Sequence, residues 1–232
     1  MLYKPAHAYI FCILVIMVRA VSLISGTGPL ADDVTLTVTM NVQQDIYEDT
    51  NFGEPPQIAV WLAHPETASI RTVWVANRAG RRLWKGKFEC PTALPIWESR
   101  HNQEKSDYKA RGLLKRLLDA VTGATPDGGE FSVTARVPRG SSWQCYVEVN
   151  LSADFNAAFP YRDETGMPDP EVNGQPSLIY RARINAVPGQ AAELELIGRS
   201  DQRVAVKNII TDLAGITSAR HAVTGLRVTC GN

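Results

Sequence analysis

The chain has no excess of charge of either sign and contains few histidines and cysteines. Among its 232 residues, 24 basic side chains balance 24 acidic ones, so the formal net charge is zero. Nucleic-acid binders normally carry a basic excess, and the balance therefore argues against such a partner. The four histidines are scattered and show no H-x-x-x-H spacing, and no C-x-x-C pair accompanies them, which argues against a zinc site.

No hydrophobic run is long enough to span a membrane. A membrane-spanning helix takes about 20 apolar residues, and the longest apolar run, 8–18, is shorter. This run follows Lys4 and precedes small residues such as Ala20. The pattern predicts a secretory signal peptide over residues 1–26, removed during export. An uncleaved anchor that resumes after Arg19 is the alternative. We predict a periplasmic or secreted protein, whose β-rich domain 27–232 keeps no membrane span.

The full sequence is 44% hydrophobic, which is ordinary for a globular protein. After the signal peptide, apolar and polar residues mostly alternate with period two. This period indicates half-buried strands bounded by Gly, Pro, Asn or Asp. We expect strands near residues 35–42, 58–62, 70–75, 131–137, 143–149, 178–184, 194–197 and 226–230. Many short strands favour a mainly β fold, an antiparallel β-sandwich of the immunoglobulin or fibronectin kind.

One segment, 106–121, has helical spacing instead. Its leucines, with Ala110 and Val121, recur every three or four residues, and lysines and arginines occupy the other face. We predict one inserted amphipathic helix that ends at Gly123. Its basic face could meet anionic lipid or a partner, although a solvated face is the commoner explanation. The segment 154–175, rich in Pro, Gly and acidic residues, is expected to be a long surface loop in which calcium binding is the alternative to solvated acid.

Three cysteines remain after the signal peptide, so at most one internal disulfide can form. Strand alternation turns Cys145 and Cys230 toward the core, and we predict that they pair. Cys90, in a connection before Pro91, would then be the leftover thiol. Pairing of Cys90 with either partner stays open, because the topology is not determined by the sequence.

Six short segments together carry a resemblance to a known family. They are PQIAVW at 56–61, RTVWV at 71–75, WKGK at 84–87, LPIW at 94–97, DAVTGAT at 119–125 and GQPSLIY at 174–180. The combination resembles the bacterial exported family called domain of unknown function 2271, over about residues 33–186, with further strands in 187–232. The resemblance implies a periplasmic β-rich domain, sometimes fused to or encoded near flavin transferases and membrane redox modules, and it implies no substrate.

The segment Asp119-x-x-Thr122-Gly123-Ala124-Thr125 is similar to the acceptor motif D-x-x-[ST]-G-A-[ST] of exported flavin transferases. The resemblance implies that FMN is joined through its phosphate to Thr125. A hydroxyl is the nucleophile that this reaction needs, and small neighbours let a bulky enzyme approach the backbone. Asp119 could orient the loop or contact the transferase.

A structural turn is the alternative interpretation of this motif. In that version Gly123 is a left-handed helix cap, and residues 126–129 form the turn into the next strand. Known flavin carriers usually show another Thr or Ser shortly after the acceptor, whereas Pro126 stands here.

Other candidate sites have weaker support. Trp84 and Trp97, flanked by Lys, Gly and Pro, could stack on a flavin or sugar ring, while Trp61, Trp74 and Trp143 fit strand cores. The polar runs 98–101 and 218–221 include Ser and His, but no G-x-S-x-G elbow is present, which argues against a hydrolase.

Two functions from different classes follow. The first is an extracytoplasmic redox carrier with covalent FMN, which a flavin transferase modifies and a membrane redox protein supplies with electrons. The second is a cofactor-free binding or structural domain that recognises an envelope protein or a glycan through its loops. In neither case is the chain expected to be a catalyst.

The signal peptide generates a first testable prediction. N-terminal sequencing of protein recovered from the cell envelope should start between about residues 21 and 27, because a signal peptidase cuts after small residues. Recovery of envelope protein that begins at Met1 would establish the uncleaved anchor instead.

Overall fold

The computed structural model describes residues 32–82, 89–90, 92–110, 112, 122–123, 126–170 and 172–232. The predicted signal peptide lies outside these residues. So do Trp84, Asp119, Ala124 and Thr125.

A four-stranded antiparallel sheet forms one layer of the domain, in the order β5-β1-β10-β8. Its strands are β1 (Asp33–Val42), β5 (Gly129–Pro138), β8 (Ala191–Glu193) and β10 (Val223–Gly231). The alternation that predicts β1 is present, since Leu36, Val38 and Met40 are buried and the residues between them are half-buried. The N-terminal and C-terminal strands therefore lie side by side, with Val38 opposite Val228.

The second layer is a six-stranded sheet in the order β4-β3-β2-β6-β7-β9. Its strands are β2 (Gln57–Ala63), β3 (Ile70–Ala76), β4 (Thr122–Gly123), β6 (Ser142–Asn150), β7 (Leu178–Asn185) and β9 (Glu195–Arg199). The predicted hairpin is confirmed, because β2 pairs with β3 in antiparallel orientation. All neighbours in this sheet are antiparallel except β3 and β4, which run parallel.

The two sheets face each other across the main core, which confirms the predicted β-sandwich. Leu36 and Val38 of one sheet and Val60, Val147 and Tyr180 of the other belong to one buried cluster. Because successive strand residues point to opposite faces, the alternate residues of the six-stranded sheet cannot reach this core.

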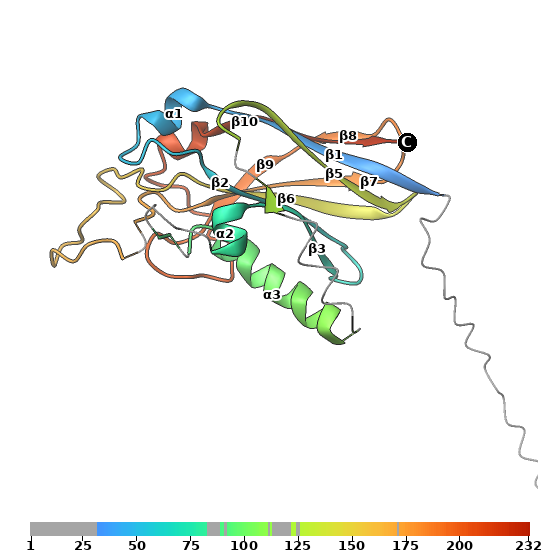
Figure 1. Cartoon of the computed structure of the whole chain (residues 1–232), viewed down its shortest axis with the longest axis horizontal. Helices are drawn as coiled ribbons and strands as arrows, with labels where there is room; N and C mark the ends of the chain where they lie inside the picture. The colour runs from blue at the N-terminus through green and yellow to red at the C-terminus, as the bar shows by residue number, and fades with distance from the viewer. Residues whose placement is uncertain are drawn as a thin grey trace, which may run out of the picture. The chain divides into compact units, whose positions relative to one another are not determined.

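Those alternate residues form a second apolar cluster on the outer face of the six-stranded sheet. Trp61, Ile179 and Ala59 come from the sheet, and Ile96 and Trp97 come from the longest described helix, α3 (Pro95–Ala110). Figure 1 shows α3 beside β3, on the side of the six-stranded sheet that faces away from β1. The sheet is thus covered on both faces.

The helical prediction needs a correction. α3 begins at Pro95, well before the predicted start at Ser106, and ends at Ala110. Gly112 has a left-handed φ of 69°, so one unbroken helix over 106–121 is wrong, while the rest of the predicted span, residues 113–121, lies outside the described residues. The other helices among the described residues are short: α1 (Gln44–Glu48), α2 (Asn77–Arg81) and the 3-10 turn η1 (Ser218–His221).

The segment 154–175 connects β6 to β7, as a long loop would, but its ends are not solvated. Asp154, Asp169, Asn173 and Gln175 are all buried. Its middle is the more exposed part, with Met167 63% exposed. The acidic side chains at the ends take part in hydrogen bonds inside the protein, and the prediction of a surface loop holds only for the centre.

The predicted disulfide is wrong. Cys145 lies on β6 of one sheet and Cys230 on β10 of the other, and both thiols are free. Both face the core, as the alternation predicts, but facing one core does not bring two residues within bonding distance. Burial raises the pKa of the Cys145 thiol to about 12, which keeps it protonated and unreactive.

The thiols can be tested directly. Peptide mapping after unfolding in N-ethylmaleimide, without reductant, should recover the Cys145 and Cys230 peptides separately and both alkylated. The same reagent added to folded protein should leave Cys145 unmodified, because its side chain has no exposed surface. A bridged Cys145–Cys230 peptide would contradict the structure.

Candidate functional site

Two residues of the predicted acceptor motif, Thr122 and Gly123, lie at an edge of the six-stranded sheet. Thr122 pairs with Val75 and Gly123 with Ala76, in parallel orientation, to form the two-residue strand β4. β4 is the outermost strand on that side. The described part of the motif therefore lies at a sheet margin, and its remaining residues, Asp119, Ala124 and Thr125, lie outside the described chain.

Gly123 is held by a close approach and not by a left-handed turn. It is absent from the positive-φ residues, so its predicted role as a left-handed helix cap is wrong. A Cβ placed on Gly123 would lie 2.4 Å from Nε1 of Trp74, too short for any real contact. Only glycine fits against this indole, which in turn packs edge-on against Phe131 at 4.8 Å.

The hydroxyl of Thr122 is bound by a neighbouring arginine. Nε of Arg81, in the last turn of α2, donates to Oγ1 of Thr122 at 2.8 Å. Two further arginines stand next to it: Arg78 pairs with Glu54 at 2.6 Å, and Arg82 pairs with Glu98. The first hydroxyl of the motif thus lies against a cationic helix end.

A second group of functional interest is the buried carboxylate of Glu148, on the outer face of β6. Its oxygens accept from the backbone N–H of Trp97 at 2.6 Å, from that of Ile96 at 3.3 Å and from the Ser177 hydroxyl at 2.6 Å. The carboxylate lies at the N-terminus of α3, where N–H groups have no helical partners. Sequence reasoning missed Glu148, although an acidic residue within the alternating pattern of β6 was a signal.

Glu148 is completely buried, and burial is the largest influence on the pKa of its side chain. Loss of solvent raises its pKa to about 7, against the hydrogen bonds from Ser177, Trp97 and Ile96, which lower it. The negative charge of Glu98, on α3, raises the pKa of Glu148 slightly further. The group therefore titrates near neutrality, and its hydrogen bonds join α3 to the sheet.

Further along α3, a cluster of Thr72, His101, Glu104 and Trp97 contains the residue types of a hydrolytic triad. The Thr72 hydroxyl donates to Oε2 of Glu104 at 2.5 Å, and Nδ1 of His101 lies 3.0 Å from the same carboxylate oxygen. Because Nδ1 also lies 3.2 Å from the hydroxyl, one ring nitrogen serves both neighbours and no relay is formed. Thr72 is only 4% exposed, so the cluster fixes α3 to β3.

Trp97 belongs to that cluster and not to a ligand platform. It is 4% exposed, stacks on His101 at 4.9 Å and donates from Nε1 to the Thr72 hydroxyl. Its predicted role as a stacking surface is therefore wrong. The core assignment is confirmed for Trp61 and Trp143, which are buried, whereas Trp74 is half-buried.

The polar run 218–221 has a structural role as well. The Ser218 hydroxyl donates to the Asp154 carboxylate, and the Gln175 amide donates to the same group at 2.6 Å. Oε1 of Gln175 accepts from the backbone of Thr217 at 2.6 Å. These bonds close the loop onto η1. Within the described ranges, no group of three His, Cys, Asp or Glu side chains is arranged to hold a metal ion.

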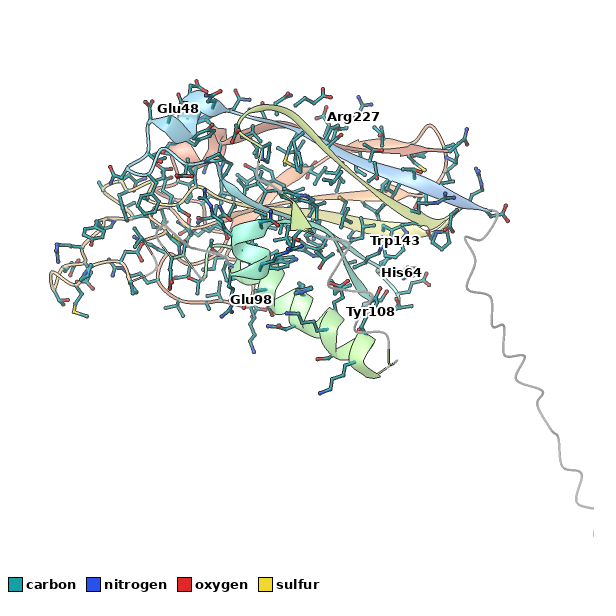
Figure 2. The ribbon with its side chains drawn as sticks, in the orientation of Figure 1. Glu48, His64, Glu98, Tyr108, Trp143 and Arg227 are labelled. Carbon is teal, nitrogen blue, oxygen red and sulfur yellow. The ribbon has the colours of Figure 1, made fainter. Side chains whose placement is uncertain are left out.

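A cleft of about 240 Å³ opens between α3 and the outer face of the six-stranded sheet. Its apolar lining comes from Trp61, Ile70, Ile96 and Ile209, and its polar lining includes Arg100 of α3. It lies at the hairpin end of β2 and β3, where His64 packs edge-on against Trp143 (Figure 2). Sequence reasoning missed this cleft, because its walls come from distant segments.

The protonation of Glu148 predicts a pH-dependent stability. A carboxyl whose pKa is about 7 in the folded protein, above its ordinary value of 4.5, stabilises the folded state below pH 4.5, and this contribution is lost as the pH rises to about 7. The free energy of unfolding of the wild type, minus that of Glu148→Gln, should therefore fall over this window by on the order of 3 kcal/mol. Urea titrations at several pH values measure it.

The matched control is Glu98→Gln, on the surface of α3 beside Arg82. The free energy of unfolding of the wild type, minus that of Glu98→Gln, should change by less than about 1 kcal/mol over the same pH window, as expected for an exposed ion pair. A difference curve for Glu148→Gln that is flat, or that rises with pH, would contradict the buried, protonated state.

Among the described residues, no helix is both long and apolar enough to cross a membrane. Comparison of the chain with protein-family models, curated proteins and solved structures finds no match. The resemblance to the family called domain of unknown function 2271 stays a prediction, and the function has to be inferred from residues and geometry.

Proposed function

We propose that this protein is an extracytoplasmic redox carrier with FMN joined covalently to Thr125. The observation that carries the proposal is the match of Asp119, Thr122, Gly123, Ala124 and Thr125 to the acceptor motif of flavin transferases. The protein is then a substrate of the transferase and no catalyst itself. It exchanges electrons with a membrane redox protein through the bound flavin.

The modification balances with FAD as the only co-substrate. The Thr125 hydroxyl attacks the phosphorus of the FMN half of FAD, and the new bond joins threonine oxygen to phosphorus. The P–O–P bond breaks, AMP leaves, and the hydroxyl proton passes to a base of the transferase. The product is a phosphodiester, which survives unfolding of the polypeptide.

The position of β4 supports this reaction. An enzyme that modifies a side chain must reach it from solvent, and modified residues accordingly lie on connections and edges. Thr122 and Gly123 form an edge strand that ends two residues before Thr125 in the sequence. The close approach of Trp74 to Gly123 restricts this position of the motif to glycine.

The charge near β4 supports it as well. Arg81 binds the Thr122 hydroxyl, three residues before the proposed phosphate-bearing oxygen. Arg78 and Arg82 belong to the same helix end, although each also has a carboxylate partner. Cationic groups near the motif would lower the free energy of a phosphodiester that forms close to them.

The compartment fits the proposal through the signal peptide pattern in residues 1–26. Export would bring the chain to the transferase and to membrane redox modules, the setting that the family resemblance implies. A flavin transferase that works on exported chains meets its substrate outside the cytoplasm, so the modification requires export of this chain.

A cofactor-free binding domain is the second candidate. It is favoured by large apolar side chains on the outer lobe of the 154–175 segment, where Tyr161 is 44% and Met167 63% exposed, and by Val204, which is 62% exposed. Arg203 holds this lobe together by donating to the Pro168 carbonyl at 3.2 Å. Exposed apolar loops of this kind suit recognition of another envelope protein.

Flavin attachment is tested by co-expression with an exported flavin transferase. The wild-type chain should gain the mass of one FMN residue and fluoresce in a denaturing gel, and peptide mapping should place the mass on Thr125. Thr125→Ala should abolish the label and Thr125→Ser should keep it, because the serine hydroxyl is still a nucleophile.

Thr134→Ala, an exposed threonine on β5, is the matched control and should be labelled like the wild type. The thermal unfolding of all variants is measured as well, because an unlabelled variant that unfolds like the wild type has lost the acceptor and not the fold. An unlabelled wild type beside a labelled known acceptor in the same cells would refute the flavin proposal and favour the binding domain.

A further inference from the structure

The cleft beneath α3 combines an apolar interior with an aromatic floor. Trp61 of β2 and Tyr146 of β6 are direct cross-strand partners, and their rings stack with centroids 5.1 Å apart and an interplanar angle of 3°. Trp61 is almost fully buried, whereas Tyr146 is half-buried, so Tyr146 offers the open part of the floor. Ile70 and Ile209 close the sides.

The polar groups of the cleft mainly present hydrogen-bond donors. The Tyr146 hydroxyl donates to Oε1 of Gln144 at 2.5 Å, so the acceptor of that amide is used and its NH₂ group remains. Nδ1 of His64 accepts from the backbone N–H of Glu66 at 3.3 Å, which leaves the ring proton on Nε2. Gln103 donates to the Ala68 carbonyl and so occupies another acceptor.

Arg100 is the charged group of the cleft. It is half-buried and follows Ile96 by one turn of α3, so both side chains lie on the same face of the helix. Over the described part of the chain, no carboxylate lies within ion-pair distance of Arg100, in contrast to Arg78 and Arg82, which both have partners. The nearby acid Glu104 is buried and bonded to Thr72.

We propose that this cleft binds a small aromatic carboxylate. The guanidinium of Arg100 matches a carboxylate in a fork-to-fork pair, and the donors on Gln144 and His64 add to the same preference for an anion. The half-buried ring of Tyr146, of which one face is covered by Trp61, leaves its other face for stacking with an aromatic ring. At about 240 Å³ the cleft is below the range of about 300–1,000 Å³ for drug-sized ligands, which limits the ring system to one or two rings.

This site is separate from the flavin proposal and does not rest on it. Ile70, at the start of β3, lines the cleft, whereas Val75, near the end of β3, pairs with β4. The protein for the test is therefore produced without a flavin transferase, so that binding is measured on the unmodified chain.

The test uses naphthoate as the probe and naphthamide as its neutral isostere, with calorimetry and tryptophan fluorescence as readouts. Naphthoate should bind saturably at one site and at least about tenfold more tightly than naphthamide, since the amide offers no charge to Arg100. Equal affinity for the two compounds, or no saturable binding of naphthoate, would overturn the proposal.

Three variants assign the binding to the cleft. Arg100→Gln should weaken naphthoate binding by about tenfold or more while leaving naphthamide unchanged, and Arg100→Lys should lie between, because it keeps the charge but loses the planar fork. Lys109→Gln, an exposed cation of the same helix, is the matched control and should bind like the wild type. Equal losses in Arg100→Gln and Lys109→Gln would show general charge attraction and refute the site.

Discussion

The six-stranded sheet has to bury both of its faces, and most of the molecule follows from this constraint. In β2 every residue from Gln57 to Leu62 is buried, with Val60 turned to the sandwich core and Trp61 turned outward. A sheet that carries apolar side chains on its outer face needs a second cover. The sandwich partner covers one face, and α3 with its adjoining segments covers the other.

Covering a sheet with a helix buries the polar helix end, which must be compensated. Glu148 does this from the sheet, by accepting from the first free N–H groups of α3. The cost is a buried carboxyl with a pKa of about 7. Farther along, Glu104 satisfies the backbone N–H of Thr72 at 3.0 Å. Two buried acids thus join one helix to two strands, which rigidly places the wall that carries Arg100.

The sequence could predict the strands and the sandwich, because period two directly reflects which side of a strand is buried. It could not predict β4, since two residues show no period, nor the start of α3 at Pro95, whose buried face mixes Trp97 with His101 and Glu104. The disulfide prediction was wrong for a related reason. Alternation shows which face of a strand a residue lies on, but not which residue lies opposite it across the core. The role of Gly123 was misjudged because a glycine needed for close approach resembles a helix cap in sequence.

β3 connects the two proposed sites, yet its anchoring argues that they act independently. The strand rises about 3.3 Å per residue, so Ile70 beside the cleft and Val75 beside β4 are on the order of 16 Å apart. Between them, Thr72 is bonded through its backbone and its hydroxyl to Glu104. A shift of β3 large enough to transmit binding from one site to the other would break these buried bonds and leave the backbone N–H of Thr72 without its acceptor and Glu104 with His101 alone, at a cost of about 1–3 kcal/mol for the unsatisfied N–H. Occupancy of the cleft and attachment at the β4 edge are therefore expected to be energetically uncoupled.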